Sequence, residues 1–112
     1  MSTKGTPHFI AQRITALLLI PTIIWFLISM VGHFGSDRAE IYAWLANRTT
    51  AMVLAVFLLA LFFHMRLGMQ EVIDDYIANP DTRSMLSFLN TFFALVIGGI
   101  AFWSILSITL TA

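Results

Sequence analysis

The residues best suited to chemistry lie between positions 64 and 76. This stretch contains no helix breaker before Asn79 and Pro80, so it predicts one continuous helix. At about 100° per residue, four side-chain positions share one face of that helix: His64, Gly68, Glu71 and Asp75. An imidazole one turn from a residue without a side chain offers a ligand nitrogen and room for a flat ring. The stripe therefore indicates a face that binds a bulky cofactor, with a carboxylate about 16 Å further along the axis.

The same residues also have simpler interpretations. A single histidine in a transmembrane helix can hydrogen-bond to a neighbouring helix, and a glycine can permit close packing. Carboxylates at Asp74 and Asp75 are typical of a solvated helix end, and Tyr76 is typical of an aromatic side chain at a membrane interface. Arg13 can extend along the helix surface to reach lipid phosphate. The spacing alone leaves cofactor binding and helix packing both open.

The composition indicates that membrane-spanning helices position these residues. Hydrophobic residues make up 59% of the chain and charged residues 11%, whereas a soluble domain has roughly a quarter of its residues charged. Cysteine is absent, which excludes disulfides and thiolate-bound metal or iron–sulfur centres. The formal net charge is zero, so no nucleic-acid partner is expected.

Three uncharged stretches are each long enough to cross a bilayer. We predict an all-α membrane protein with three transmembrane helices in a single domain, residues 1–112. The predicted spans cover residues 14–31, 49–77 and 86–111, and the second includes an extension beyond the inner membrane surface. Pro21 should bend the first span without breaking it.

Two further patterns predict local structure. Asp37 and Glu40 have capping-box spacing, which predicts a short helix in the outer interface between the first two spans. In the third span, four residues recur at steps of four, four and three, which predicts a face that packs closely against another helix: Asn90, Ala94, Gly98 and Ala101.

The distribution of basic residues predicts the orientation in the membrane. Three spans place the two termini on opposite sides, and the positive-inside rule then compares two groups of basic residues: Lys4, Arg13, Arg66 and Arg83 against Arg38 and Arg48. The larger group predicts a cytoplasmic N-terminus and a periplasmic C-terminus. We recognise neither a signal-peptide cleavage site nor an Arg-rich transit segment, so we expect a bacterial inner-membrane protein.

The chain resembles a known family along its whole length. Arg13-Ile-Thr-Ala opens the first of three spans, and the inner end of the second carries the string His64-x-x-x-Gly68-Met69-x-x-Val72-x-x-Asp75-Tyr76. This pattern is similar to the signature of the smaller hydrophobic anchor subunit of succinate dehydrogenase, respiratory complex II, of the alphaproteobacterial and mitochondrial type.

The resemblance implies a role for each matching residue. His64 would be an axial ligand of the haem b iron, and Arg13 would contact a haem propionate. Asp75 and Tyr76 would border the site where ubiquinone is reduced. His8 lies near the position where some members place a second histidine that contacts a propionate, although its spacing from Arg13 differs from theirs.

At one position the chain departs from that family. Arg66 stands where an apolar or aromatic residue is common. Helical spacing places it about 160° away from His64. We therefore expect Arg66 to meet lipid headgroups or a partner chain.

The resemblance implies an anchor subunit of succinate:quinone oxidoreductase that is not catalytic alone. Electrons from succinate, an intermediate of the tricarboxylic acid cycle, would reach ubiquinone through a flavoprotein and an iron–sulfur subunit. A second membrane anchor would supply the other haem ligand within a larger haem-binding helical bundle. The alternative is a small non-redox membrane protein, either a transporter or an assembly scaffold.

Overall fold

The structure, a computed structural model, describes residues 5–111. Over that range its regular secondary structure consists of helices alone. It contains four helices: α1 (Gly5–Gly32), α2 (Arg38–Ala46), α3 (Arg48–Tyr76) and α4 (Pro80–Thr111). By length and composition α1, α3 and α4 can each cross a membrane. The predicted all-α fold with three spans is thus confirmed. Lys4, which contributed to the predicted orientation, lies outside the described residues.

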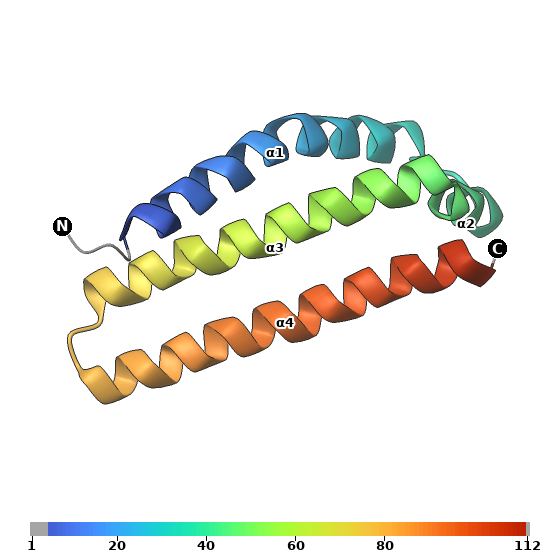
Figure 1. The fold of residues 1–112 in the computed structure, drawn as a ribbon. Coiled ribbons are helices and arrows are strands. Elements are labelled where there is room, and N and C mark those ends of the chain that lie inside the picture. Colours follow the sequence, from blue (N-terminus) through green and yellow to red (C-terminus); the bar gives the residue numbers. More distant parts are fainter. Residues whose placement is uncertain (1–4, 112) are drawn as a thin grey trace.

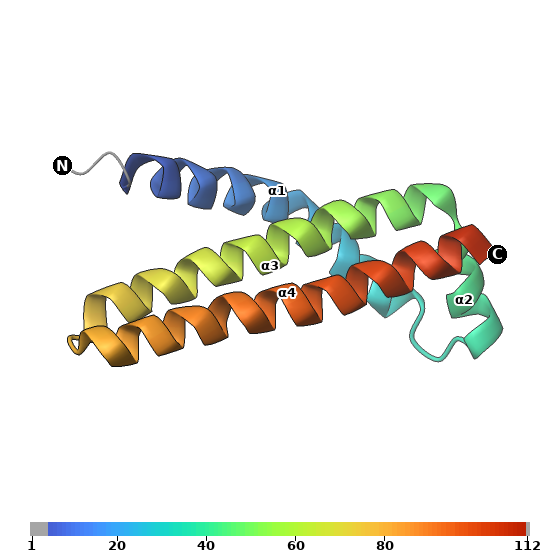
Figure 2. The ribbon, with the colours of Figure 1, turned by 60° about the horizontal axis from the view of Figure 1, so that its bottom comes forward.

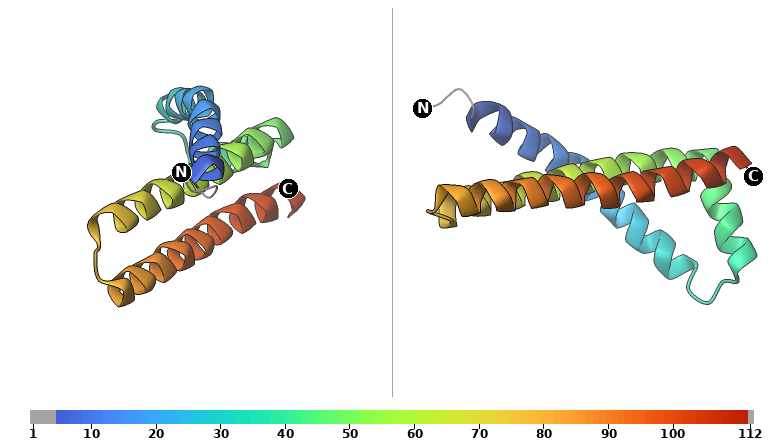
Figure 3. Two further views of the ribbon diagram at one scale, coloured as in Figure 1. Left: turned by 60° about the vertical axis from the view of Figure 1, so that its left-hand side comes forward. Right: turned by 90° about the horizontal axis from the view of Figure 1, so that it is seen from below.

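The three long helices are arranged with α3 in the middle (Figure 1). α3 contacts α1 on one side and α4 on the other, and within residues 5–111 α1 makes no contact with α4. α3 and α4 run side by side along their length, whereas α1 crosses α3 at an angle (Figures 2 and 3). The first turn of α1 and the α3–α4 connection lie at one end of the molecule, and α2 lies at the other. The face of α3 that contacts α1 is therefore separate from the face that contacts α4.

Two helices begin before the predicted spans, and the second span agrees to within one residue at each end. α1 begins at Gly5 and α4 at Pro80, because each helix continues through polar residues that lie outside the apolar core. The start of α4 is capped by Asn79, whose side-chain oxygen accepts hydrogen bonds from the backbone N–H groups of Asp81 and Thr82 at 2.9 and 3.1 Å. Pro80 suits the first helical position, where its missing N–H has no intrahelical partner.

The short helix predicted between the first two spans is present as α2. The side chain of Asp37 accepts a hydrogen bond from the backbone N–H of Glu40 at 2.9 Å, as capping-box spacing predicts. Asn47 caps the start of α3 in the same way, through the N–H groups of Thr49 and Thr50. Asn47, which ends α2 and caps α3, thus lies at the corner between these two helices.

Pro21 lies inside α1 and does not end it. Figure 1 shows α1 changing direction near its middle, as expected for a proline that removes one backbone donor. The carbonyl left without its usual partner is that of Leu17. The Thr22 hydroxyl donates to the next carbonyl, that of Leu18, at 2.7 Å.

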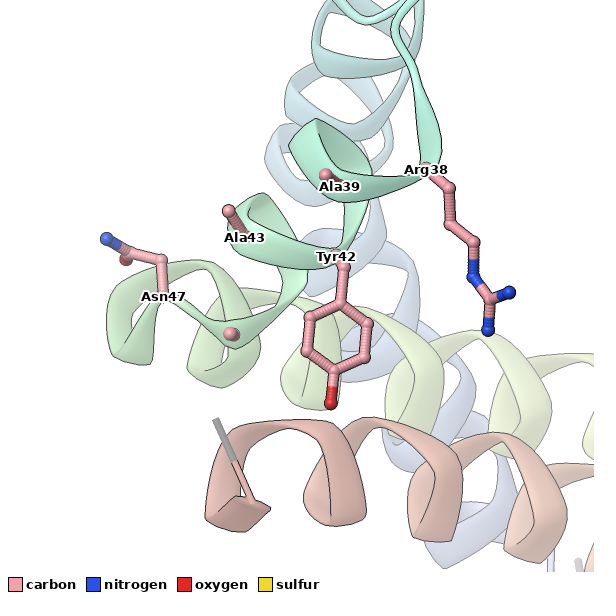
Figure 4. A pocket seen from close by; sticks show the side chains of 6 residues that line it. Arg38, Ala39, Tyr42, Ala43 and Asn47 are labelled. Carbon is pink, nitrogen blue, oxygen red and sulfur yellow. The ribbon is translucent and has the colours of Figure 1, made fainter.

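Aromatic side chains hold the end of the molecule that contains α2. Trp44 packs on Trp25, with ring centroids 6.0 Å apart, and on His33 at 4.6 Å. The Tyr42 hydroxyl lies 3.5 Å from that of Thr111, and Figure 4 shows Tyr42 pointing from α2 toward α4. An open hollow of about 780 Å³ lies along α2 between Arg38 and Asn47. It lies at the opposite end of α3 from His64 and adds nothing to that site.

Candidate functional site

His64 faces α1, where it is bound by a threonine. Its Nδ1 atom lies 2.9 Å from the Oγ1 atom of Thr15, which is 7% exposed. The Thr15 hydroxyl also lies 2.9 Å from the carbonyl oxygen of Ala11 and 3.0 Å from that of Gln12. A residue of α1 thus holds His64, the one histidine of α3, in place.

This geometry favours one tautomer of His64. A hydroxyl has one hydrogen, and the carbonyl oxygens of Ala11 and Gln12 both lie within reach of the Thr15 hydroxyl. When Thr15 donates to its own helix, it accepts a hydrogen bond from the protonated Nδ1 atom of His64. The Nε2 atom of the neutral ring then keeps its lone pair, which is the form of histidine that ligates a metal.

The glycine one turn from His64 is covered by a side chain of α1. A Cβ atom added at Gly68 would lie 3.3 Å from the Nε2 atom of Gln12. The Oε1 atom of Gln12 is buried and has no hydrogen-bond partner. A buried acceptor without a partner typically costs about 1–3 kcal/mol, so the amide is not held strongly in this position. The space beside His64 is thus occupied by a long side chain that can move.

These observations fit a flat cofactor ligated by one imidazole of this chain. His64 supplies a nitrogen of the right tautomer, and Gly68 leaves a space that only the Gln12 side chain enters. Within residues 5–111, no group of three or more His, Asp or Glu side chains could surround a metal ion.

Between His64 and the beginning of α3, the α1–α3 contact is packed by aromatic and small residues. Phe26 of α1 stacks on Phe57 of α3, with ring centroids 4.9 Å apart. Phe57 and Ala60 are each 4% exposed. Between His64 and the beginning of α3 this face is thus packed mainly by apolar side chains, with Thr50 as a buried polar residue near the start of the helix.

Toward the first turns of α1, the helices α1 and α3 diverge. Thr15 pairs with His64 and Gln12 with Gly68, so the same antiparallel register brings His8 opposite Glu71. Both of these side chains are exposed, and Figure 3 shows the first turns of α1 diverging from α3. His8 therefore shares a face of α1 with Thr15 but contacts no side chain that fixes it among residues 5–111.

Arg13 lies on a different face of α1. Helical spacing places it about 160° from Thr15. Its guanidinium lies 5.0 Å from the ring centroid of Phe9, and its side chain is exposed. The structure thus brings His8, and not Arg13, onto the face that meets α3.

The pair expected at the quinone site lies at the C-terminal end of α3. Asp75 is exposed and Tyr76 is 80% exposed. Tyr76 is the last residue of α3, twelve positions after His64, which corresponds to about 18 Å along the axis. This chain therefore contributes one wall of any site at Tyr76.

Polar side chains link α3 to α4 on the face opposite His64. The Nε atom of Arg66 donates to the Thr91 hydroxyl at 3.2 Å, and the Asn90 amide donates to the Arg66 carbonyl at 2.9 Å. A Cβ atom at Gly98 would lie 3.4 Å from Phe62. The predicted packing face of the third span is thus present, and its partner is α3 of the same chain. Arg66 thus contacts α4 of the same chain, whereas its position on the helix had led us to expect lipid headgroups or a partner chain.

The long apolar helices and their polar contacts define a multi-pass helical membrane protein. Residues 1–108 match the succinate dehydrogenase/fumarate reductase transmembrane subunit family, and the chain belongs to this family. The resemblance seen in the sequence is confirmed.

Several proteins of known name are similar to the chain. It is 33% identical over 84 residues to the succinate dehydrogenase hydrophobic membrane anchor subunit of Rickettsia bellii, covering 74% of this chain and 66% of that protein. It is 27% identical over 94 residues to that of Rickettsia conorii, covering 83% and 75%. It is 28% identical over 89 residues to the succinate dehydrogenase membrane anchor subunit of Reclinomonas americana, covering 77% and 74%. The chain thus spans about two thirds to three quarters of the length of these relatives.

Proposed function

We propose that the chain is a membrane anchor subunit of a succinate:quinone oxidoreductase, and that it binds haem b and forms part of the ubiquinone site. Its family and the names of its relatives support the anchor role. The hydrogen bond between Thr15 and His64 carries the haem assignment, because it leaves Nε2 as the ligand atom.

The residues of this chain would hold the haem between α1 and a partner helix. His64 would supply one imidazole ligand, and Gln12 would move away from Gly68 to admit the edge of the ring. A second anchor subunit would supply the other imidazole. Haem b held in this way would supply one-electron storage. His8 and Arg13, both near the inner end of α1, are the candidates for binding the two propionates.

Asp75 and Tyr76 would serve quinone reduction at the inner end of α3. Reduction of a quinone to a quinol takes up two protons as well as two electrons. The Tyr76 hydroxyl can donate a hydrogen bond to a quinone oxygen as negative charge develops there. Asp75 is exposed to water and can pass protons toward that oxygen. The remaining walls would come from the second anchor and the iron–sulfur subunit.

The charges at the two ends support an orientation with Tyr76 on the cytoplasmic side of a bacterial inner membrane. Arg13, Arg66 and Arg83 lie toward the end of the molecule that contains the α3–α4 connection, and Arg38 and Arg48 lie toward the other, so among the described residues three basic side chains face two. The iron–sulfur and flavoprotein subunits would dock at the end that contains Tyr76, where electrons from succinate arrive.

Purification of the tagged chain from native membranes tests this proposal. We expect flavoprotein and iron–sulfur subunits to co-purify, together with a reduced low-spin b-type absorption spectrum and succinate-dependent ubiquinone reduction. Purification of the chain without these subunits and without haem would contradict the proposal and would favour a scaffold or transporter.

A further inference from the structure

A groove between α3 and α4 lies on the face of α3 away from His64. It has a volume of about 320 Å³ and is open along one side. Nine of its ten lining residues are apolar, and Arg66 is the tenth. The two glycines of the lining differ: Gly98 packs against Phe62, whereas a Cβ atom at Gly99 would meet nothing within 4 Å. Gly99 thus lines the groove at a point where there is room for a side chain.

The position of Arg66 relates the groove to the membrane surface. α3 begins at Arg48, eighteen residues before Arg66. This separation corresponds to about 27 Å along the axis, close to the roughly 30 Å thickness of a hydrocarbon core. If Arg48 marks the outer boundary of the core, the Arg66 guanidinium lies at the inner one, at the level of lipid phosphates.

The groove extends from Arg66 toward the middle of the membrane. Its lining on α3 runs from Arg66 to Leu58, a length of about 12 Å along the axis. A hydrocarbon chain descending from an inner-leaflet headgroup would follow this direction. Thr91 binds the Nε atom of Arg66 at 3.2 Å, which holds the guanidinium at the inner end of the groove.

We propose that this groove binds one anionic phospholipid of the inner leaflet, with an acyl chain along Gly99 and the phosphate on Arg66. A guanidinium binds phosphate through charge-assisted hydrogen bonds. The volume suits a slender apolar ligand and lies at the low end of the roughly 300–1,000 Å³ found for ligand pockets.

Native mass spectrometry of the delipidated, detergent-solubilised complex tests the lipid site. The probes are dioleoylphosphatidylglycerol, which is anionic, and dioleoylphosphatidylcholine, which is zwitterionic. We expect the wild type to bind one phosphatidylglycerol in preference to phosphatidylcholine. Gly99→Leu fills the groove and should lower the affinity for both lipids. Arg66→Gln should weaken phosphatidylglycerol binding about tenfold, the effect of losing one charge-assisted hydrogen bond, and weaken phosphatidylcholine binding less, because the choline cation already offsets the charge of its phosphate.

Two variants provide matched controls. Gly32→Leu adds the same side chain at a glycine that also has open space around it but lies outside the groove. Arg83→Gln removes an arginine of α4 that does not line the groove. Both should bind phosphatidylglycerol as the wild type does. Equal binding by Gly99→Leu and Gly32→Leu would overturn the proposal.

A single cysteine identifies the occupant directly, because the chain has no cysteine of its own. Gly99→Cys carrying a photoactivatable label should cross-link to phospholipid in native membranes. Cross-linking to a protein subunit instead would show that a partner helix covers the groove and would refute the lipid site. Haem content and quinone reduction should be unchanged in Gly99→Leu, so the two proposals can fail separately.

Discussion

The Oγ1 atom of Thr15 on α1 lies 2.9 Å from the Nδ1 atom of His64 on α3, and the same hydroxyl donates to a carbonyl of α1. The histidine is therefore oriented by a residue 49 positions away in the sequence. A hydrogen bond of this kind sets both the tautomer and the basicity of a metal-ligating imidazole.

Removing the Thr15 hydroxyl should weaken haem binding without removing the ligand. Thr15→Val keeps the shape of the side chain, and loss of an outer partner of a ligating histidine typically costs about 10- to 100-fold in affinity. The haem midpoint potential should also rise, because a less basic imidazole stabilises the ferric state less. Redox titration and haem content of the purified complex measure both effects.

Two variants separate this role from general packing. Thr15→Ser should retain the wild-type potential, and Thr22→Val removes a hydroxyl of α1 that bonds only to its own helix. A Thr15→Val complex with wild-type potential and haem content would show that the hydrogen bond does not act on the ligand.

Replacing His64 should remove the low-spin b-type spectrum. No other histidine among the described residues lies on the face of α3 that meets α1, so His64→Leu leaves the haem without its ligand from this chain. His33→Leu changes a histidine that packs on Trp44 at the opposite end and should leave the spectrum unaltered. A native spectrum in an assembled His64→Leu complex would assign His64 to packing alone.

The two candidates for propionate binding can be ranked by substitution. If the guanidinium of Arg13 neutralises a propionate, Arg13→Leu should lower the haem midpoint potential, because the ferrous state then loses a stabilising positive charge. Since α1 places His8 and not Arg13 on the face toward α3, His8→Leu should have an effect at least as large. Redox titration of both variants, with Arg13→Lys as the control that keeps the charge, gives the order. Wild-type potentials in all three would mean that α1 binds no propionate.

Removing the Tyr76 hydroxyl should slow quinone reduction selectively. The loss of one donor to a developing oxyanion costs on the order of 3 kcal/mol, or roughly a hundredfold in rate. Tyr76→Phe should therefore reduce ubiquinone-linked turnover and leave succinate oxidation with a soluble artificial acceptor intact. Tyr42→Phe, at the opposite end of the molecule, should change neither rate. Wild-type ubiquinone turnover and inhibitor sensitivity in Tyr76→Phe would make Tyr76 an interfacial anchor.

The sequence predicted the fold well because its main signals are local. Uncharged stretches locate the spans, and the Asp37–Glu40 spacing locates α2. The same signals underestimated α1 and α4, since hydropathy marks the apolar core of a helix and not the polar turns at its ends. The small-residue face of α4 was predicted, but its partner was not, because a packing stripe does not say which helix it meets.

The candidate site was predicted only in part for a similar reason. His64 stands out because it is the one imidazole in the second span. Thr15 does not stand out, since a threonine in an apolar helix is common and only the crossing of α1 over α3 brings it to the ring. Gln12 was missed in the same way, and its amide fills the space that Gly68 alone had seemed to leave open. The opposite faces of Arg13 and His8 also depend on where α1 meets α3.

α3 runs without a break from His64 to Tyr76, so this helix fixes the distance between the proposed haem ligand and the proposed quinone-site residue. Their separation of about 18 Å follows from the rise per residue and is maintained by backbone hydrogen bonds, so changes in bilayer thickness cannot stretch it. The helix also fixes the angle between the two side chains around its axis. Inserting one alanine between the two residues would lengthen the separation by only about 1.5 Å but would turn Tyr76 by about 100° around the axis. Under the proposed function, quinone reduction would therefore depend more on the rotation of Tyr76 around the α3 axis than on its distance from His64.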